Sequence, residues 1–302
     1  MTNGMASTRA AEHFGTVLVA MITPFDKDNK LDVDAGVKLA KKLVADGADG
    51  ILLAGTTGES PTTSVEEKLT LLREIKAAVG HEAKILAGAG SYNTATSVEL
   101  ARQSEAAGAD GLLVVTPYYS KPPQQGLYYH FREVAGAVDL PVMLYDIPGR
   151  TATPIMEETA MRLAEVPNIV AIKEAKGDLA GGTRIYQNTD LALYSGDDPI
   201  NIPWLSVGAT GFVSVIGHVA ARTLRDMLTA FDSGDLAEAQ RLNATMFPLN
   251  RAMARTGGVS FAKAALNLIG VPVGVPRLPQ IPVEGELLDM LAADLRAAGI
   301  LN

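Results

Sequence analysis

Gly47-Ala48-Asp49-Gly50-Ile51-Leu52 returns along the chain as Gly108-Ala109-Asp110-Gly111-Leu112-Leu113 and as Gly208-Ala209-Thr210-Gly211-Phe212-Val213. Each copy leads into a short apolar run. The first glycine of each copy suits the end of a helix, and the tetrapeptide then turns the chain into a strand. The chain has 29 glycines, so single Gly-Ala pairs are common, but three copies at strand entrances make chance the weaker explanation. The repeat predicts the starts of the second, fourth and eighth strands.

Eight short apolar runs alternate with amphipathic, helix-like segments from residue 16 onward. Such runs, rich in leucine and β-branched residues, are typical of parallel strands covered by helices. Eight strand–helix units predict a (β/α)8 barrel, the TIM barrel fold. The predicted strands are residues 16–22, 50–54, 84–88, 111–115, 141–145, 169–173, 191–194 and 211–215. The predicted helices between them include residues 33–46, 65–79, 95–107, 126–138 and 155–165.

After residue 215 the pattern is helical only, and this sets the predicted domains. We expect helices at residues 220–231, 236–254, 261–268 and 284–298, of which the first closes the barrel. Residues 1–13 are polar and Ala-rich, without the apolar core of a signal peptide, and we interpret them as a disordered tail. The expected organisation is this tail, a catalytic barrel at 14–232 and a C-terminal helical extension at 233–302.

Composition excludes several classes of function. The 302 residues are 47% hydrophobic and carry a net charge of −8, which argues against a surface for nucleic acid or anionic membranes. No apolar run reaches the ~18 residues that a membrane span needs. Without cysteine there is no disulfide or thiolate chemistry, which fits a cytoplasmic protein. The four histidines, His13, His81, His130 and His218, lack the spacing of metal ligands, so we expect no metal site.

A lysine lies inside the apolar run Asn168-Ile169-Val170-Ala171-Ile172-Lys173-Glu174-Ala175. Burial of an ammonium group is costly, so a lysine in a buried strand needs a partner or a function. A neutral buried amine is a nucleophile that forms Schiff bases with carbonyl compounds, and burial lowers its pKa in that direction. The segment alone favours the plainer interpretation, in which Lys173 ends the strand with its head group in solvent.

The alternation of side chains along strands reverses that preference. The aliphatic face of each strand should meet the outer helices, which leaves Lys173, Tyr145 and Thr56 pointing into the barrel. All three lie at the carboxyl ends of their strands, where such barrels have their active sites. Three polar groups that converge from three strands predict an active site.

The loops after these strands add groups that suit carboxylates. Gly55-Thr56-Thr57-Gly58-Glu59-Ser60 offers N–H and hydroxyl donors but lacks the spacing of a phosphate loop, and an ordinary turn explains it as well. Thr116-Pro117-Tyr118-Tyr119 follows the fourth strand. Two adjacent tyrosines are usually packing residues, which is the plainer interpretation here. Arg150, in Tyr145-Asp146-Ile147-Pro148-Gly149-Arg150, is either a surface charge or a fork for a substrate carboxylate.

These motifs resemble those of the 4-hydroxy-tetrahydrodipicolinate (dihydrodipicolinate) synthase family, within the pyruvate-dependent class I aldolases and lyases. The matching motifs are GTTGES, TPYY, YDIPGR, the strand lysine in IVAIKEA, and Ser195-Gly196-Asp197-Asp198. They occur in the family's order and at compatible spacing from about Gly15 onward. YDIPGR and TPYY favour the synthases over the other members of the wider family.

The resemblance implies condensation of pyruvate with L-aspartate 4-semialdehyde, the committed step of lysine and diaminopimelate biosynthesis, with no cofactor. It implies that Lys173 forms the Schiff base with pyruvate. Tyr145, Thr56 and Tyr119 would relay protons, with Tyr119 contributed by a neighbouring subunit. The implied substrate-binding residues are Thr57 for the pyruvate carboxylate, Val213 and Gly196 in the same site, and Arg150 for the carboxylate of the semialdehyde.

The resemblance also implies a homotetramer built from tight dimers. Family members inhibited by lysine have a polar pocket, often with a histidine, at the tight-dimer interface. The corresponding stretches here, residues 60–68 and 90–96, contain no histidine, carry Lys68, and have Thr96 where a carboxylate would help to bind an ammonium group. We therefore expect weak or no inhibition by L-lysine, and inhibition at sub-millimolar lysine would contradict this.

Two alternatives remain. The first is a related pyruvate lyase that cleaves N-acetylneuraminate or a 2-keto-3-deoxy sugar acid with the same lysine. Such a site needs several partners for substrate hydroxyls, whereas the loop with Arg150 suits a shorter adduct with two carboxylates. The second is a barrel without catalytic activity that acts as a scaffold, which would lack the lysine, the tyrosine or the loop threonine, and none of these is missing.

Overall fold

The computed structural model describes residues 10–301, and its eight strands follow one another in chain order in a closed barrel. The strand pairs β1–β2 and β3 through β8 are parallel, which confirms the predicted fold class. Five strands are buried at every residue, so the barrel strands form the centre of the core. The strands are β1 (Val17–Ala20), β2 (Gly50–Leu53), β3 (Lys84–Gly88), β4 (Gly111–Val115), β5 (Val142–Asp146), β6 (Ile169–Glu174), β7 (Ala192–Ser195) and β8 (Gly211–Ser214).

Each predicted strand is present. The bounds of β3 and β4 are those predicted, and each of the other strands differs from its prediction by one or two residues at one or both ends. The apolar runs therefore locate the strands, while their last residues depend on where the parallel ladder stops.

The chain divides into two compact units, which differ from the predicted domains. The first unit comprises the residues up to Thr16 together with Lys84–Val213. The second comprises Val17–Ala83 and the residues from Ser214 onward. The helices predicted as a separate extension from residue 233 thus belong to the same unit as β1 and β2.

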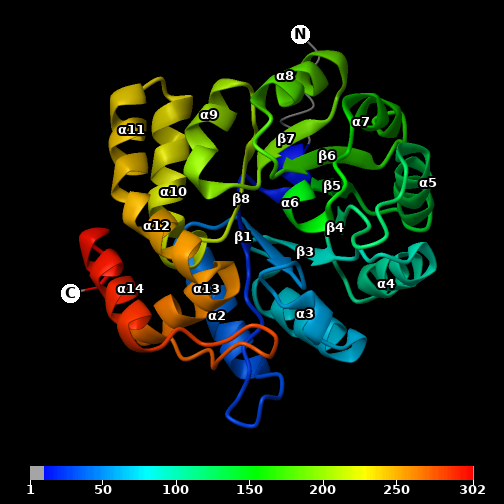
Figure 1. The fold of residues 1–302 in the computed structure, drawn as a ribbon. Coiled ribbons are helices and arrows are strands. Elements are labelled where there is room, and N and C mark those ends of the chain that lie inside the picture. Colours follow the sequence, from blue (N-terminus) through cyan, green and yellow to red (C-terminus); the bar gives the residue numbers. More distant parts are fainter. Residues whose placement is uncertain (1–9, 302) are drawn as a thin grey trace. The chain divides into compact units, whose positions relative to one another are not determined.

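In the first unit, helices cover the outer side of the strands. Neighbouring helices pack in the order α4, α5, α7 and α8, outside β4 to β7 (Figure 1). The short helices α6, α8 and α9 are not among those predicted. Residues 10–14 are also helical, with Ala10 and Phe14 buried, so the predicted tail is wrong for 10–13, and its remainder lies outside the described residues. The helices are α4 (Thr94–Ala106), α5 (Gln124–Ala135), α6 (Pro148–Thr151), α7 (Glu157–Leu163), α8 (Leu179–Asn188) and α9 (Asn201–Ser206).

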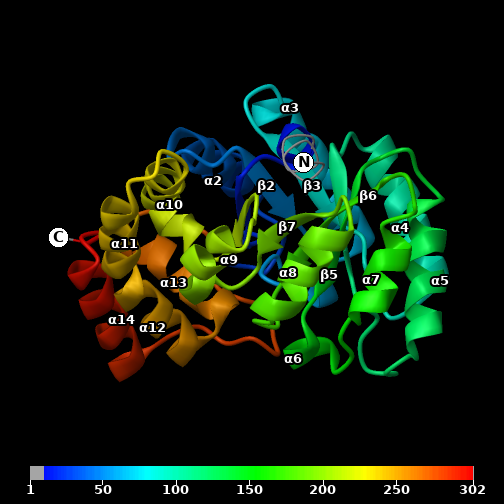
Figure 2. The same ribbon diagram turned by 90° about the horizontal axis from the view of Figure 1, so that it is seen from above.

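In the second unit, α10 to α14 pack against one another, as Figure 2 shows. The single helix predicted for residues 236–254 is wrong, because the chain forms two helices that meet at Met246. Pro248 in the first turn of the second helix has no N–H to continue the first one, and it was the overlooked signal. The helices are α2 (Val33–Ala45), α3 (Val65–Val79), α10 (Gly217–Asp232), α11 (Leu236–Thr245), α12 (Phe247–Thr256), α13 (Gly258–Leu268) and α14 (Gly285–Ala297).

The repeated Gly-Ala motif marks the junctions from helix to strand. Gly47, Gly108 and Gly208 follow α2, α4 and α9 with φ of 103°, 92° and 99°, the left-handed conformation that ends a helix. In the first two copies the aspartate has a second task. Asp49 Oδ1 accepts a hydrogen bond from Val17 N at 2.7 Å, and Asp110 Oδ2 accepts one from the N–H of the second residue of β3 at 2.8 Å. The motif thus ends a helix and anchors the start of the preceding strand.

Candidate active site

Lys173 and Tyr145 form a buried pair in the first unit. They are register partners on β6 and β5, and they are 4% and 5% exposed. Lys173 Nζ lies 4.1 Å from the centroid of the Tyr145 ring, so both side chains point to the same side of the sheet. For these two residues, the shared face agrees with the predicted alternation of side chains along their strands. The buried amine and the phenol are close enough to act on one small molecule.

Gly196, directly after β7, makes room for the Lys173 side chain. A Cβ atom at this position would lie 2.7 Å from Lys173 Cε and 3.0 Å from the Cβ of Ala175, closer than side chains tolerate. The N–H of Gly196 donates to the Glu174 carbonyl at 2.8 Å, which holds the backbone in place. Gly196 therefore shapes the space around the amine through its missing side chain.

A buried ion pair fixes the segment that carries Arg150. Asp146, the last residue of β5, is fully buried and accepts hydrogen bonds from Ile155 N at 3.1 Å and Lys176 Nζ at 2.8 Å. Burial raises the pKa of Asp146, and Lys176 opposes that rise. These contacts close residues 147–154 into a defined loop. Nothing in the sequence signalled this pairing, because it joins positions 30 residues apart.

Arg150 lies on the short helix α6 and is exposed. Within residues 10–301 its guanidinium has no hydrogen bond or ion pair to the protein. The backbone around it is held by Thr151 Oγ1, which donates to the carbonyls of Ile147 and Thr153, both at 3.1 Å. The guanidinium of Arg150 thus lies on a turn with a fixed backbone and is accessible to a ligand.

Tyr119, in the middle of the loop between β4 and α5, is 92% exposed and has φ of 74°. A left-handed conformation is rare for a residue with a bulky side chain and is usually kept for a reason. Tyr118, its neighbour, packs edge-on against Tyr92 with the ring centroids 5.4 Å apart. The exposed ring of Tyr119 is therefore not part of the buried Lys173–Tyr145 pair within one chain.

Val213 lies on β8 beyond the residues that pair with β7, and it is 2% exposed. The predicted contact of its backbone with pyruvate therefore stays a prediction.

The glycine-rich loop belongs to the second unit. Thr57 is 7% exposed and Thr56 is exposed. Strand alternation does not extend to Thr56, because β2 ends at Leu53 and Ala54 has a φ of 53°, so the direction of the Thr56 side chain stays a prediction. Position in the loop, rather than strand parity, decides where these threonines point.

The described residues 10–301 contain no group of three or more His, Cys, Asp or Glu side chains placed to hold a metal ion. In the same residues no helix is both long and apolar enough to cross a membrane.

Three comparisons with known proteins all point to one family. The model of the dihydrodipicolinate synthetase family matches residues 13–298. The 4-hydroxy-tetrahydrodipicolinate synthase of Corynebacterium jeikeium (strain K411) is 57% identical over 300 residues, which cover 99% of this chain and 100% of that protein. These likenesses do not favour the sugar-acid lyase.

Two solved structures are similar over nearly their whole length. The dihydrodipicolinate synthase of Cyanidioschyzon merolae with lysine bound is 43% identical with a TM-score of 0.93, covering 96% of this chain and 99% of that one. The chloride-inhibited enzyme of Acinetobacter baumannii complexed with pyruvate is 36% identical with a TM-score of 0.91, covering 95% and 99%.

Proposed function

The chain belongs to the dihydrodipicolinate synthetase family, and we infer that it condenses pyruvate with L-aspartate 4-semialdehyde to give 4-hydroxy-tetrahydrodipicolinate. The net reaction joins the two substrates and releases water. It is the committed step of lysine and diaminopimelate biosynthesis.

The observation that carries the mechanism is the amine of Lys173, 4% exposed and 4.1 Å from the centre of the Tyr145 ring. In the proposed sequence, Lys173 attacks the ketone carbon of pyruvate, and loss of water gives an iminium ion. Loss of a methyl proton then gives an enamine, whose carbon adds to the aldehyde. The amino group of the semialdehyde then attacks the imine carbon, which closes the ring and releases the amine of Lys173. Tyr145 moves protons in these steps, a contribution typically worth about 10²–10⁴-fold in rate.

The substrate carboxylates are assigned to separate donors. Thr57 holds the carboxylate of pyruvate, and the backbone of Val213 with the space left by Gly196 completes that site. Arg150 takes the carboxylate of the semialdehyde, which its exposed guanidinium on a fixed turn supports. A planar fork binds a carboxylate with two parallel hydrogen bonds and thereby orients the aldehyde.

Tyr119 and Thr56 complete the proposed proton relay with Tyr145, and Tyr119 acts in a neighbouring subunit. Its 92% exposure and its φ of 74° support this role, since the ring projects from its own chain. The working enzyme is then at least a dimer, and we propose the tetramer of tight dimers that the family resemblance implies.

A coupled assay tests the function. Pyruvate and L-aspartate 4-semialdehyde are supplied with the NADPH-dependent reductase that consumes the product, and NADPH oxidation is followed. The parent protein should turn over, whereas Lys173→Ala should lose nearly all activity and keep its thermal stability. Absence of turnover in a folded parent would overturn the proposal.

A further inference from the structure

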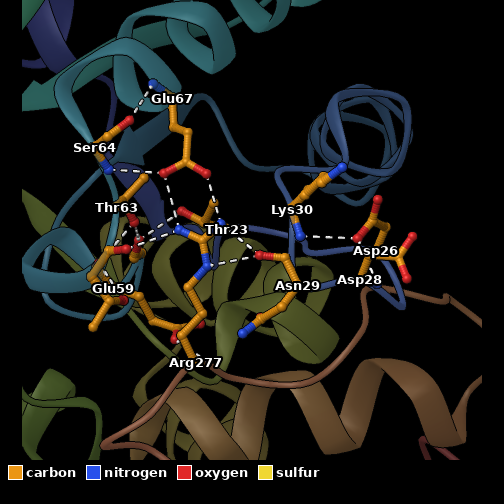
Figure 3. Close-up of polar contacts among 12 residues, drawn as sticks. Thr23, Asp26, Asp28, Asn29, Lys30, Glu59, Thr63, Ser64, Glu67 and Arg277 are labelled. Atoms are coloured by element: carbon orange, nitrogen blue, oxygen red, sulfur yellow. Dashed lines mark hydrogen bonds and ion pairs between the residues drawn. The ribbon is translucent and has the colours of Figure 1, made fainter.

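Four charged side chains that the proposed reaction does not use form a cluster in the second unit: Glu59, Glu67, Lys263 and Arg277. Glu59 lies near the end of the glycine-rich loop after β2, Lys263 is on α13, and Arg277 lies between α13 and α14. Figure 3 shows Arg277 between Glu67 and Asn29, with Glu59 beside it. The cluster joins the substrate loop to the C-terminal helices.

Each oxygen of the Glu59 carboxylate has a partner from the C-terminal segment. Lys263 Nζ lies 2.6 Å from Oε1, and the two side chains are 1% and 2% exposed. The backbone N–H of Arg277 donates to Oε2 at 2.8 Å. Among residues 10–301, Oε1 has no hydrogen-bond partner besides this ion pair. Removal of either charge would leave the other buried without compensation, which is strongly unfavourable.

The side chain of Arg277 is itself fixed at several points. Its Nη2 and Nη1 atoms lie 2.6 and 3.0 Å from the two carboxylate oxygens of Glu67. The same guanidinium donates to the carbonyls of Asn29 at 2.7 Å and Thr62 at 2.8 Å. Glu67 also accepts from Ser64 N at 2.8 Å as part of the cap of α3. These contacts place the N–H of Arg277 where it meets Glu59.

Glu59 stabilises the charged form of Lys263. Burial lowers the pKa of Lys263 to about 8, and the carboxylate of Glu59 opposes that fall. The amine also donates to the carbonyl of Val275 at 3.0 Å and lies 4.0 Å from the centroid of the Phe25 ring. The amine has no route to solvent that would replace these partners, because the residue is 1% exposed.

The loop needs this support because its backbone is unusual. Glu59 has φ of 56° and ψ of 39°, and Ala54 has φ of 53°, both left-handed conformations that are unfavourable for residues with a Cβ atom. Gly58 lies in a space where a Cβ would come within 3.0 Å of Ala54 N and Met21 O, and its carbonyl accepts from Thr23 Oγ1 at 2.6 Å. Conformations of this kind persist only where the surroundings enforce them.

We propose that Glu59 is a positioning residue, which Lys263 and Arg277 hold so that Thr57, two residues earlier, presents its donors to the pyruvate carboxylate. The inference rests on the proposed function. It assigns the helices after the barrel a part in substrate binding, although none of their side chains touches the substrate in this account.

The test compares pyruvate dependence with stability. Glu59→Gln removes the charge with little change of shape, and Glu59→Gln with Lys263→Met removes both charges. If the pair positions the loop, the KM for pyruvate rises on the order of tenfold, while the KM for the semialdehyde stays within about twofold. The pyruvate concentration that gives half-maximal borohydride trapping should rise in parallel.

Asp294→Asn is the matched control. Asp294 is a buried carboxylate that pairs with Arg251 and Arg255 in the C-terminal helices of the same unit and has no contact with the loop. Its substitution should lower the Tm without changing the KM for pyruvate. The two Glu59 variants should instead change both.

The outcomes separate the two claims. If the parent forms no pyruvate adduct and shows no turnover, the proposed function fails. If the parent is active and both Glu59 variants lose stability as Asp294→Asn does but keep the parent's KM for pyruvate, the pair is only structural and the positioning role is refuted. If Glu59→Gln does not fold, the double variant provides the same test, because removing both charges leaves neither of them buried and unpaired.

Discussion

At the scale of single residues, the site is defined by what surrounds one amine. Lys173 faces the ring of Tyr145 on one side and the missing side chain of Gly196 on another. The lysine and the tyrosine were predictable from strand alternation, since each lies in the regular part of its strand, beyond the register shift between Val142 and Met143. The need for glycine at position 196 was not predictable, because a sequence gives no distance between the end of one strand and a side chain on the neighbouring strand.

We expect Gly196→Ala to reduce kcat by roughly 10- to 100-fold, because the new methyl group displaces the Lys173 side chain. The added Cβ would lie 2.7 Å from Lys173 Cε. Gly126→Ala in α5 is the control, since a Cβ there makes only ordinary contacts of 3.5 Å or more. Steady-state kinetics on both variants would contradict the account if Gly196→Ala kept the parent's kcat.

At the scale of elements, the sequence located every strand but not the contacts that lock the elements together. Periodicity and glycine caps locate a strand or a helix because they are local signals. The ion pair between Glu59 and Lys263 joins one residue near the start of the barrel to one after its last strand. No local sequence pattern predicts such a contact. The prediction for Thr56 extended a strand rule past Leu53, where the strand ends, so it stays a prediction.

His218, at the start of α10, makes another contact that holds distant segments together. Its Nε2 atom accepts from Ile22 N at 3.0 Å, and its Nδ1 atom lies 2.7 Å from the Val215 carbonyl. Complete burial lowers its pKa to about 4, so the folded protein keeps this histidine neutral at pH values where the unfolded chain protonates it. Between about pH 6.5 and pH 4 the unfolded state therefore binds one proton more, and the free energy of unfolding falls as the pH falls.

We predict that His218→Gln reduces the pH dependence of stability in that window by up to ~1.4 kcal/mol per pH unit. Urea unfolding at pH 7, 6 and 5 would measure the slope for parent and variant. His130, whose pKa burial also lowers to about 4, keeps its own contribution in both proteins. An unchanged slope in the variant would show that His218 does not carry this linkage.

At the scale of the whole molecule, we propose that a second copy of the chain completes the site. Lys173 and Tyr145 are buried in one unit, whereas Tyr119 is exposed. Fold class and family follow from the sequence, because the barrel repeat and the motifs are both written in it. The oligomeric assembly does not follow from the sequence, since nothing in one chain indicates directly which exposed residues contact a partner.

Co-expression of Tyr119→Phe with Lys173→Ala tests the exchange of tyrosines between subunits. Each variant alone should be nearly inactive. Random pairing within dimers gives mixed dimers with one site that has both Lys173 and Tyr119, so activity should recover to about a quarter of the parent's. No recovery in mixed dimers isolated through two affinity tags would mean that Tyr119 acts within its own chain or not at all.

The central claim is that Lys173 is the amine that binds pyruvate. The protein has a second deeply buried lysine, Lys263, which is 1% exposed and has a pKa lowered to about 8, so burial alone does not identify the nucleophile. The most direct measurement is borohydride reduction in the presence of pyruvate, followed by peptide mass mapping of the parent and of Lys173→Ala. We predict a stable adduct on the peptide that contains Lys173 in the parent and none in the variant. An adduct on Lys263, or one that persists in Lys173→Ala, would contradict it.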